Sequence, residues 1–323
     1  MRREKLIIGA GIILAILPFV LTEYWLGLLT QALIFGGFAM GLDLLVGYTQ
    51  MPTLGHAAFF GLAGYGTALA ITRFGINPWV AAGIGVVLSG GVALAFAPLA
   101  VRVRGLTFLT ITLAFGQVAW GIATRWTSFT GGENGIPSVP RPDFIWDINE
   151  RTGFFYLTLI VVIFVSLLIS VFASSAVGMS FMGVRGSDTR MSALGYNVQS
   201  RRATAFIVAA LVAAVYGVLS TFFNKFIGTG SLSWQLSAQM LLAVVVGGFG
   251  SLWGPFVAGS GLHIFKTLLI GSTQRWPMVL GLLYVISVVF LPGGLSSLVP
   301  TIRQRMTRQS KGKEYAPYGT NSK

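Results

Sequence analysis

A polar interval between two long apolar segments reads SSAVGMSFMGVRGSDTRMSALGYNVQSRR, from Ser174 to Arg202. Within it Ser187 and Asp188 can cap a short helix over residues 190–194, and Gly195 can end that helix in the left-handed conformation that glycine tolerates. A helix of under two turns is not stable alone in water, so it must rest on its own membrane domain or on a partner protein. We therefore interpret the interval as a docking element.

The composition on both sides of this interval is that of a helical membrane protein. Of 323 residues, 54% are hydrophobic and 10% are charged, the mean hydropathy is +0.77, and 42 glycines are scattered through the apolar runs. This profile predicts an all-α, polytopic membrane protein. The chain has no cysteine, which excludes disulfides, thiolate metal sites and cysteine nucleophiles.

About ten apolar segments are candidates for crossing the bilayer. They lie at residues 6–21, 25–48, 57–72, 79–100, 106–124, 154–173, 203–223, 236–246, 258–270 and 277–291. The first is either a signal peptide or a span, and we expect a span because no small-x-small cleavage site follows it before Glu23. Pro52 and Gly55 predict a helix break after the second segment, and residues 247–255 predict a glycine-rich turn between tightly packed helices.

The basic residues test the orientation of these segments. With the N-terminus inside, 15 Lys and Arg residues fall on the inner side and 6 on the outer side, and Lys266 is left within a segment. This asymmetry predicts that both termini are cytoplasmic, and it explains the net charge of +13 better than nucleic-acid binding does. We expect a membrane domain over residues 1–300, with a periplasmic loop at 125–153, a cytoplasmic loop at 174–202 and a basic cytoplasmic tail at 301–323.

Several motifs carry a family resemblance, and they occur in the family's order. They are Gly47-Tyr48, Leu54-Gly55-His56-Ala57-Ala58-Phe59-Phe60-Gly61 with Gly64-Tyr65, then Leu113-Ala114-Phe115-Gly116, Thr130-Gly131-Gly132-Glu133-Asn134-Gly135-Ile136-Pro137, and Val246 to Pro255. Together they resemble the LivM-type permease subunits of high-affinity branched-chain amino acid transporters. The resemblance runs from about the second apolar segment to Gly294.

The resemblance implies a membrane subunit of an ATP-binding cassette importer in the bacterial inner membrane, working by alternating access. In that family a second homologous permease subunit completes the pathway, usually as a heterodimer, two cytoplasmic ATPase subunits use ATP and Mg, and a periplasmic binding protein delivers the solute. The chain has no G-x-x-x-x-G-K-[ST] motif, so another chain must handle ATP. We expect no cofactor, no metal site and no catalytic residue in this subunit.

The same resemblance places the coupling helix, which receives the movement of the ATPases, at residues 188–195. A short helix held at both ends by spans can turn the movement of a docked partner into tilting of those spans. The residues that we expect to couple the subunit to the ATPases are Arg185, Asp188, Arg190, Ala193, Leu194 and Gly195.

Three residues are candidates for lining the pathway: Asp43, His56 and Gln117. Asp43 and Gln117 stand where the family usually has asparagine and an acidic residue, which leaves the solute open among branched-chain amino acids, urea, amides and carboxylic acids. A carboxylate within a span is costly, so Asp43 either faces the pathway or makes a structural hydrogen bond to a neighbouring backbone. His56 either lines a gate or ties together the broken backbone beside it.

Other features have simpler interpretations. The spacing of Gly37 and Gly41 is typical of close helix packing, as is that of Gly250 and Gly254. Lys266 can extend to the outer interface, so we assign it no transport role. In the outer loop, Gly132, Glu133 and Asn134 form a tight turn or part of the surface that receives the binding protein.

Functions of other classes are also open to a chain of this kind. An ion-coupled secondary transporter can use Asp43 and His56 as a proton relay and needs no ATPase. A passive channel needs no docking loop. A membrane enzyme fits less well, because the sequence has no H-E-x-x-H, no G-x-S-x-G and no clustered histidines.

Overall fold

The computed structural model describes residues 17–19, 21–143, 149–290 and 294–297. The expected first span at 6–21 lies almost entirely outside these ranges, as does the basic tail at 301–323. The long helices are α2 (Glu23–Thr49), α3 (Ala57–Phe74), α4 (Pro78–Ala100), α5 (Gly105–Arg125), α7 (Arg151–Ser174), α10 (Val198–Asn224) and α12 (Trp253–Ser272). The shorter α-helices are α6 (Thr127–Thr130), α8 (Ala176–Gly186), α9 (Asp188–Ala193), α11 (Trp234–Gly247) and α13 (Trp276–Phe290). The remaining elements are the 3₁₀ turns η1 (Leu17–Phe19), η2 (Gly132–Asn134), η3 (Thr229–Leu232) and η4 (Leu295–Ser297), and the strands β1 (Ile136–Pro137) and β2 (Phe226–Ile227).

The predicted all-α fold is confirmed, and each expected segment from residue 25 onward is a helix. Within the described residues, five helices are long and apolar enough to cross a membrane, namely α2, α4, α5, α7 and α10. The number of spans and the side on which each terminus lies stay predictions.

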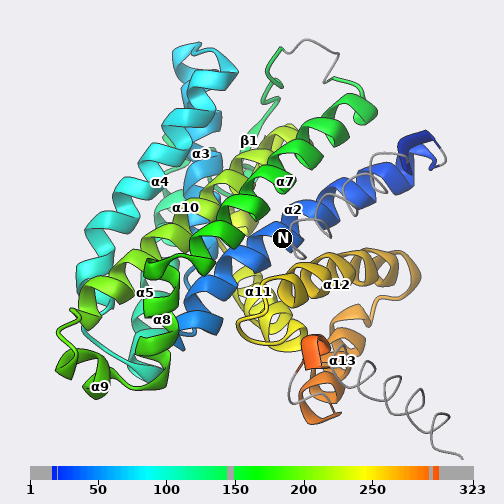
Figure 1. The fold of residues 1–323 in the computed structure, drawn as a ribbon. Coiled ribbons are helices and arrows are strands. Elements are labelled where there is room, and N and C mark those ends of the chain that lie inside the picture. Colours follow the sequence, from blue (N-terminus) through cyan, green and yellow to red (C-terminus); the bar gives the residue numbers. More distant parts are fainter. Residues whose placement is uncertain (1–16, 20, 144–148, 291–293, 298–323) are drawn as a thin grey trace, which may run out of the picture.

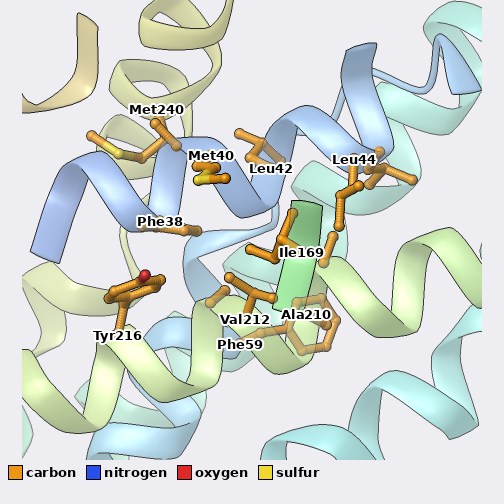
Figure 2. Packing of buried hydrophobic residues seen from close by; sticks show 14 of the residues in the cluster. Phe38, Met40, Leu42, Leu44, Phe59, Ile169, Ala210, Val212, Tyr216 and Met240 are labelled. Carbon is orange, nitrogen blue, oxygen red and sulfur yellow. The ribbon is translucent and has the colours of Figure 1, made fainter. Parts of the chain in front are cut away.

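Helix α2 runs through the centre of the molecule, with α3, α4, α7 and α10 on one side and α11, α12 and α13 on the other (Figure 1). Because α2 is packed on all sides, it is apolar around its whole circumference, and its residues from 36 to 49 are all buried. Figure 2 shows its Phe38 and Met40 among side chains of the surrounding helices, including Tyr216 of α10 and Met240 of α11.

The glycines of α2 let its neighbours approach closely. A side chain at Gly37 would collide with Tyr216, and one at Gly41 with Val212, so α10 packs directly on the α2 backbone. Gly36 lies in the same way against Ser260 of α12. The packing interpretation of Gly37 and Gly41 is therefore confirmed.

The predicted break after α2 is confirmed, because residues 50–56 are not helical. Helix α3 then begins with a cap supplied from far along the chain, since the Ala57 N–H donates to Ser237 Oγ of α11 at 2.9 Å. Gly55 lies against the Thr112 carbonyl of α5, where a larger residue would collide. The break is thus held by contacts with α5 and α11.

The glycine-rich turn at residues 248–252 is also confirmed, and it joins α11 to α12. Gly250 has φ +76° and Leu252 has φ +59°, so the chain reverses through left-handed conformations. Gly254, the second residue of α12, lies against the Gly247 carbonyl, which allows the two helices to pack closely at the turn.

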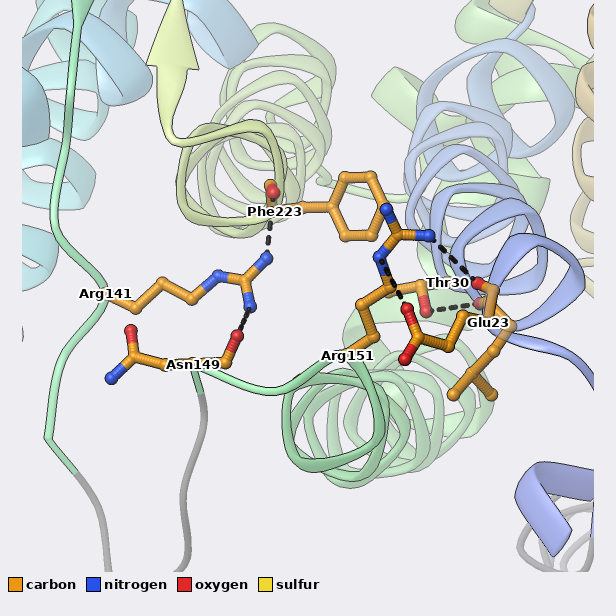
Figure 3. Close-up of polar contacts among 7 residues, drawn as sticks. Glu23, Thr30, Arg141, Asn149, Arg151 and Phe223 are labelled. Atoms are coloured by element: carbon orange, nitrogen blue, oxygen red, sulfur yellow. Dashed lines mark hydrogen bonds and ion pairs between the residues drawn. The ribbon is translucent and has the colours of Figure 1, made fainter.

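At one end of the bundle the loop after α6 is folded onto the other helices. Strand β1 pairs antiparallel with β2, with Ile136 opposite Ile227. The Arg141 guanidinium donates to the carbonyls of Phe223 and Asn149 at 3.0 and 3.1 Å (Figure 3). It also donates to the Phe222 carbonyl at 3.0 Å and lies over the Phe154 ring. Burial and the nearby charge of Arg151 lower the pKa of Arg141.

Candidate functional site

The docking interval forms two short helices, α8 and α9, at the opposite end of the bundle from β1 (Figure 1). Ser187 caps α9, because its Oγ accepts from the Arg190 N–H at 3.3 Å. The helix therefore begins at Asp188, two residues earlier than the sequence predicted, and ends at Ala193. An acidic residue in the first turn also favours this start, since it complements the helix dipole.

The predicted end of this helix is confirmed. Gly195 has φ +85°, the left-handed conformation, and the Tyr196 N–H donates back to the Met191 carbonyl at 3.0 Å. Met191 packs with Val184 of α8 and Val198 of α10. A six-residue helix thus rests on its own membrane domain through one buried side chain.

One carboxylate oxygen of Asp188 attaches α9 both to α10 and to the residue just before α5. Its Oδ2 lies 2.7 Å from Arg202 Nη2 of α10 and 2.5 Å from Arg104 Nη1, just before α5. The side chains of Asp188 and Arg202 are only 14% and 9% exposed, whereas that of Arg104 is 64% exposed. Because a pair removed from water is screened less, the contact with Arg202 is the stronger anchor.

Arg185 connects α8 to the central helix. Its Nη1 donates to the Gly47 carbonyl in the last turn of α2 at 2.6 Å. One turn earlier on α2, Asp43 Oδ1 accepts from the Gly250 N–H at 2.8 Å and Oδ2 accepts from the Leu252 N–H at 2.9 Å. A continuous series of polar contacts therefore runs from α8 through α2 to the turn between α11 and α12.

The side of the docking interval that faces away from the helix bundle is not covered by any described part of the chain. Arg190, Ala193, Leu194 and Gly195 are all exposed, and Leu194 is exposed by 73%. Tyr196, which the sequence reasoning did not single out, is exposed beside them. An exposed leucine and tyrosine next to a rigidly held helix are suited to contact with a protein partner.

The three pathway candidates lie in different environments. Asp43 is completely buried, and both of its oxygens are bound by backbone N–H groups, which is the structural alternative expected for it. Gln117 is exposed on α5 and lines a cavity of about 190 Å³ with Trp120, Ser233 and others. The pathway role of each of these residues stays a prediction.

His56 does not tie the broken backbone together, so that expectation is wrong. Its ring is completely buried and stacks near Phe38, with Phe59 and Phe206 edge-on. Neither ring nitrogen makes a hydrogen bond of good geometry to a described residue. The backbone of Ala209 is nevertheless close enough to interact electrostatically with the ring. The cap of α3 comes from Ser237 instead, because helix packing brings that hydroxyl to the chain break.

The outer-loop candidates separate by exposure. Glu133 and Asn134 are exposed, whereas Gly132 is buried with φ +60° beneath Thr127. The tight turn expected from the glycines is therefore present. Of these three candidates, Glu133 and Asn134 are the ones whose side chains a partner can contact.

From the sequence, Arg104 and Arg202 were expected only to contribute to the charge asymmetry that indicates topology. The sequence does not show these contacts, because helices α5 to α8 separate Arg104 from Asp188 and Arg202 lies on another helix, α10. Lys266 was expected to extend to the membrane interface, but its Nζ donates to Gln239 Oε1 of α11 at 3.0 Å and lies 5.5 Å from the Trp276 ring. Packing of α12 against α11 and α13 provides these nearer partners.

The motifs that carry the resemblance meet in the structure. Gly116 lies against the Cα atom of Gly55, which joins the motif in α5 to the motif before α3. Gly47 lies beside the backbone of Gly250, which joins the first motif to the last. Small residues in distant motifs thus form the close contacts between helices.

Comparisons with known proteins agree with this arrangement. Residues 24–291 match the family described as branched-chain amino acid transport system / permease component. The chain is 24% identical to the high-affinity branched-chain amino acid transport system permease protein LivM of Salmonella typhimurium, over 97% of this chain and 79% of that protein. It is 25% identical to LivM of Escherichia coli, over 91% of this chain and 75% of that protein.

No solved structure matches the chain. The family match runs from the second residue of α2 to the end of α13, and therefore includes the docking interval and the turn that Asp43 holds. The chain belongs to the family of branched-chain amino acid transport system permease components.

Proposed function

We propose that this chain is the membrane permease subunit of an ATP-binding cassette importer in the bacterial inner membrane. A second, homologous permease subunit would complete the pathway as a heterodimer, and two cytoplasmic ATPases would use ATP and Mg. A periplasmic binding protein would deliver a branched-chain amino acid or a related small solute. Family membership and the two LivM relatives support this proposal.

The observation that carries the mechanism is the anchored helix α9. Met191 and Asp188 hold it against α8, α10 and the start of α5, while Leu194 and Tyr196 face outward. A docked ATPase that moves α9 must therefore move these helices as well. Two alternative packings of the helices would then open the pathway first to the outside and then to the inside.

Arg185 and Asp43 extend this coupling inward. Movement of α8 would pull on the end of α2 through the Arg185 to Gly47 contact. Asp43, one turn away, would pass the displacement to the turn between α11 and α12. The ion-coupled alternative is disfavoured, because the buried and doubly hydrogen-bonded Asp43 offers a coupling ion no access in this conformation.

The test is a set of variants at the tip of the docking interval. Replacing Ala193, Leu194 and Gly195 with charged residues should abolish ATP-driven uptake and weaken ATPase binding, with the subunit still in the membrane. Because Gly195 is left-handed, its replacement also adds backbone strain, so Leu194→Glu alone is the cleaner variant.

Gln199→Glu is the matched control. Gln199 is also exposed within residues 174–202, but it lies on the first turn of α10 and not at the tip formed by residues 193–195. Uptake in proteoliposomes and co-purification of the ATPase are measured for every variant. Normal uptake with Leu194→Glu would contradict docking at this surface. Uptake by the purified chain without ATP would contradict the importer as a whole.

A further inference from the structure

Four polar side chains gather where α2, α11 and α12 pack together. Lys266 of α12 donates to Gln239 of α11 at 3.0 Å, and His263 Nε2 lies 3.1 Å from Gln31 Oε1 of α2. His263 and Lys266 are three residues apart, so they project from the same face of α12. We refer to Gln31, Gln239, His263 and Lys266 as the polar cluster.

The polar cluster lies toward the end of the bundle that carries β1 and Arg141. Gln31 Nε2 donates to Asn224, the last residue of α10, at 3.2 Å. Lys266 is six residues before the end of α12, which is about 9 Å at 1.5 Å per residue. The distribution of basic residues assigns this end to the outside, where an importer first receives its solute.

Lys266 has no carboxylate partner among the described residues. Its contacts there are the neutral amide of Gln239 and the ring of Trp276. An ammonium group has three N–H donors, and the described residues accept from one of them. A cation within apolar helices is costly, so one that lacks a counter-ion marks a place where an anion is stabilised.

The neighbouring groups suit a carboxylate. The amides of Gln31 and Gln239 can each supply an N–H donor to a second oxygen, while His263 Nε2 donates to Gln31 Oε1 and so orients that amide. Phe35 stacks on the His263 ring at 4.4 Å, which fixes the ring and places an apolar surface beside it. All four members of the polar cluster are partly exposed, so a small solute can reach them.

We propose that Lys266, together with the other members of the polar cluster, binds the carboxylate of the transported solute in the outer part of the pathway. This inference rests on the proposed function and narrows its solute to a small molecule with a carboxylate group. Urea and simple amides are excluded as the preferred cargo, because they leave the ammonium charge uncompensated.

The first experiment measures how well a carboxylate protects Lys266 from chemical modification. The assembled transporter in right-side-out membrane vesicles is treated from outside with a membrane-impermeant amine-reactive ester, and labelled peptides are quantified by mass spectrometry. The probes are isovalerate and isovaleramide, which share their apolar part and do not consume the reagent. We expect isovalerate to slow labelling of Lys266 severalfold and isovaleramide to have little effect.

Lys225 provides an internal control, because it is exposed at the same end of the bundle. Its labelling should be the same with either probe. Equal protection of Lys266 by both probes would overturn the proposal, as would no protection or no labelling of Lys266 at all. These results do not depend on ATP, so they separate this inference from the proposed function, which ATP-dependent uptake by the unaltered complex tests.

A second measurement uses variants at the same position. Lys266→Gln should lower uptake of a carboxylate solute about tenfold or more, because a hydrogen bond to a charged group is lost. Lys266→Arg, which keeps the charge, should restore much of the uptake, and Lys225→Gln should behave like the unaltered protein. Equal loss with Gln and Arg would indicate a packing role and overturn the proposal.

Discussion

Replacing Asp188 with asparagine should weaken the attachment of α9 to α10 far more than its attachment to the start of α5. The carboxylate contacts Arg202 at 2.7 Å, and the Arg202 side chain is 9% exposed. Loss of the negative charge leaves that guanidinium without its counter-ion in a poorly hydrated place. A hydrogen bond to a charged group contributes about 1.5–3 kcal/mol, and we expect a coupling energy in this range for the pair.

The contact of Asp188 with Arg104 should contribute much less. Arg104 is 64% exposed, and exposed ion pairs contribute about 0.2–1 kcal/mol because water and salt screen them. The two pairs share one carboxylate oxygen, so the comparison isolates the effect of burial. High salt should reduce the Arg104 coupling further and leave the Arg202 coupling nearly unchanged.

Two double-mutant cycles measure these energies. One combines Asp188→Asn with Arg202→Gln and the other combines it with Arg104→Gln, and unfolding of the purified subunit is followed in mixed micelles. ATP hydrolysis per solute transported is measured for the same variants in the assembled complex. A coupling energy for Arg104 equal to or above that for Arg202 would refute the ranking by burial. Full coupling of transport to hydrolysis in Asp188→Asn would refute its role in holding α9.

Two further predictions concern residues away from α9. Asp43→Asn should destabilise the subunit by about 1–3 kcal/mol, because the amide NH2 replaces one of the two oxygens that accept from the N–H groups of Gly250 and Leu252. Unfolding in mixed micelles measures this loss. A change in solute preference with unchanged stability would instead favour the pathway role. Arg141→Met should lower the thermal unfolding midpoint, because it leaves three backbone carbonyls without their donor. The loss should not vary with pH near neutrality, because an arginine stays charged there even when burial lowers its pKa. A loss that varies strongly with pH would contradict this account.

Much of the local structure could be predicted from the sequence because its causes act over a few residues. Apolar runs placed α2 to α5, α7 and α10 to α13, whereas α6 and α8 were not predicted. Pro52 and Gly55 marked the break before α3, and Gly195 marked the end of α9. The start of α9 was misplaced by two residues, because serine and aspartate are both good caps and only the Ser187 contact decides between them.

The partners of the polar residues could not be predicted in the same way. Asp43 was expected to need a partner, but nothing in the sequence identifies the N–H groups of Gly250 and Leu252, which lie more than 200 residues away. One of the two alternatives for His56 was a bond to the backbone beside it, but its ring is instead enclosed by aromatic rings. These outcomes depend on which helices pack together.

By itself the sequence determined that the chain is a helical membrane protein, where its helices break, which loops carry positive charge and which family its motifs resemble. Those properties follow from hydrophobicity, backbone conformation and charge, which each residue brings to its own segment. Only the tertiary structure shows that Asp188 holds α9 through Arg202. It also shows that Lys266 binds Gln239 and has no carboxylate partner among the described residues. These contacts require helices distant in the chain to pack at one angle and register, which local properties do not fix.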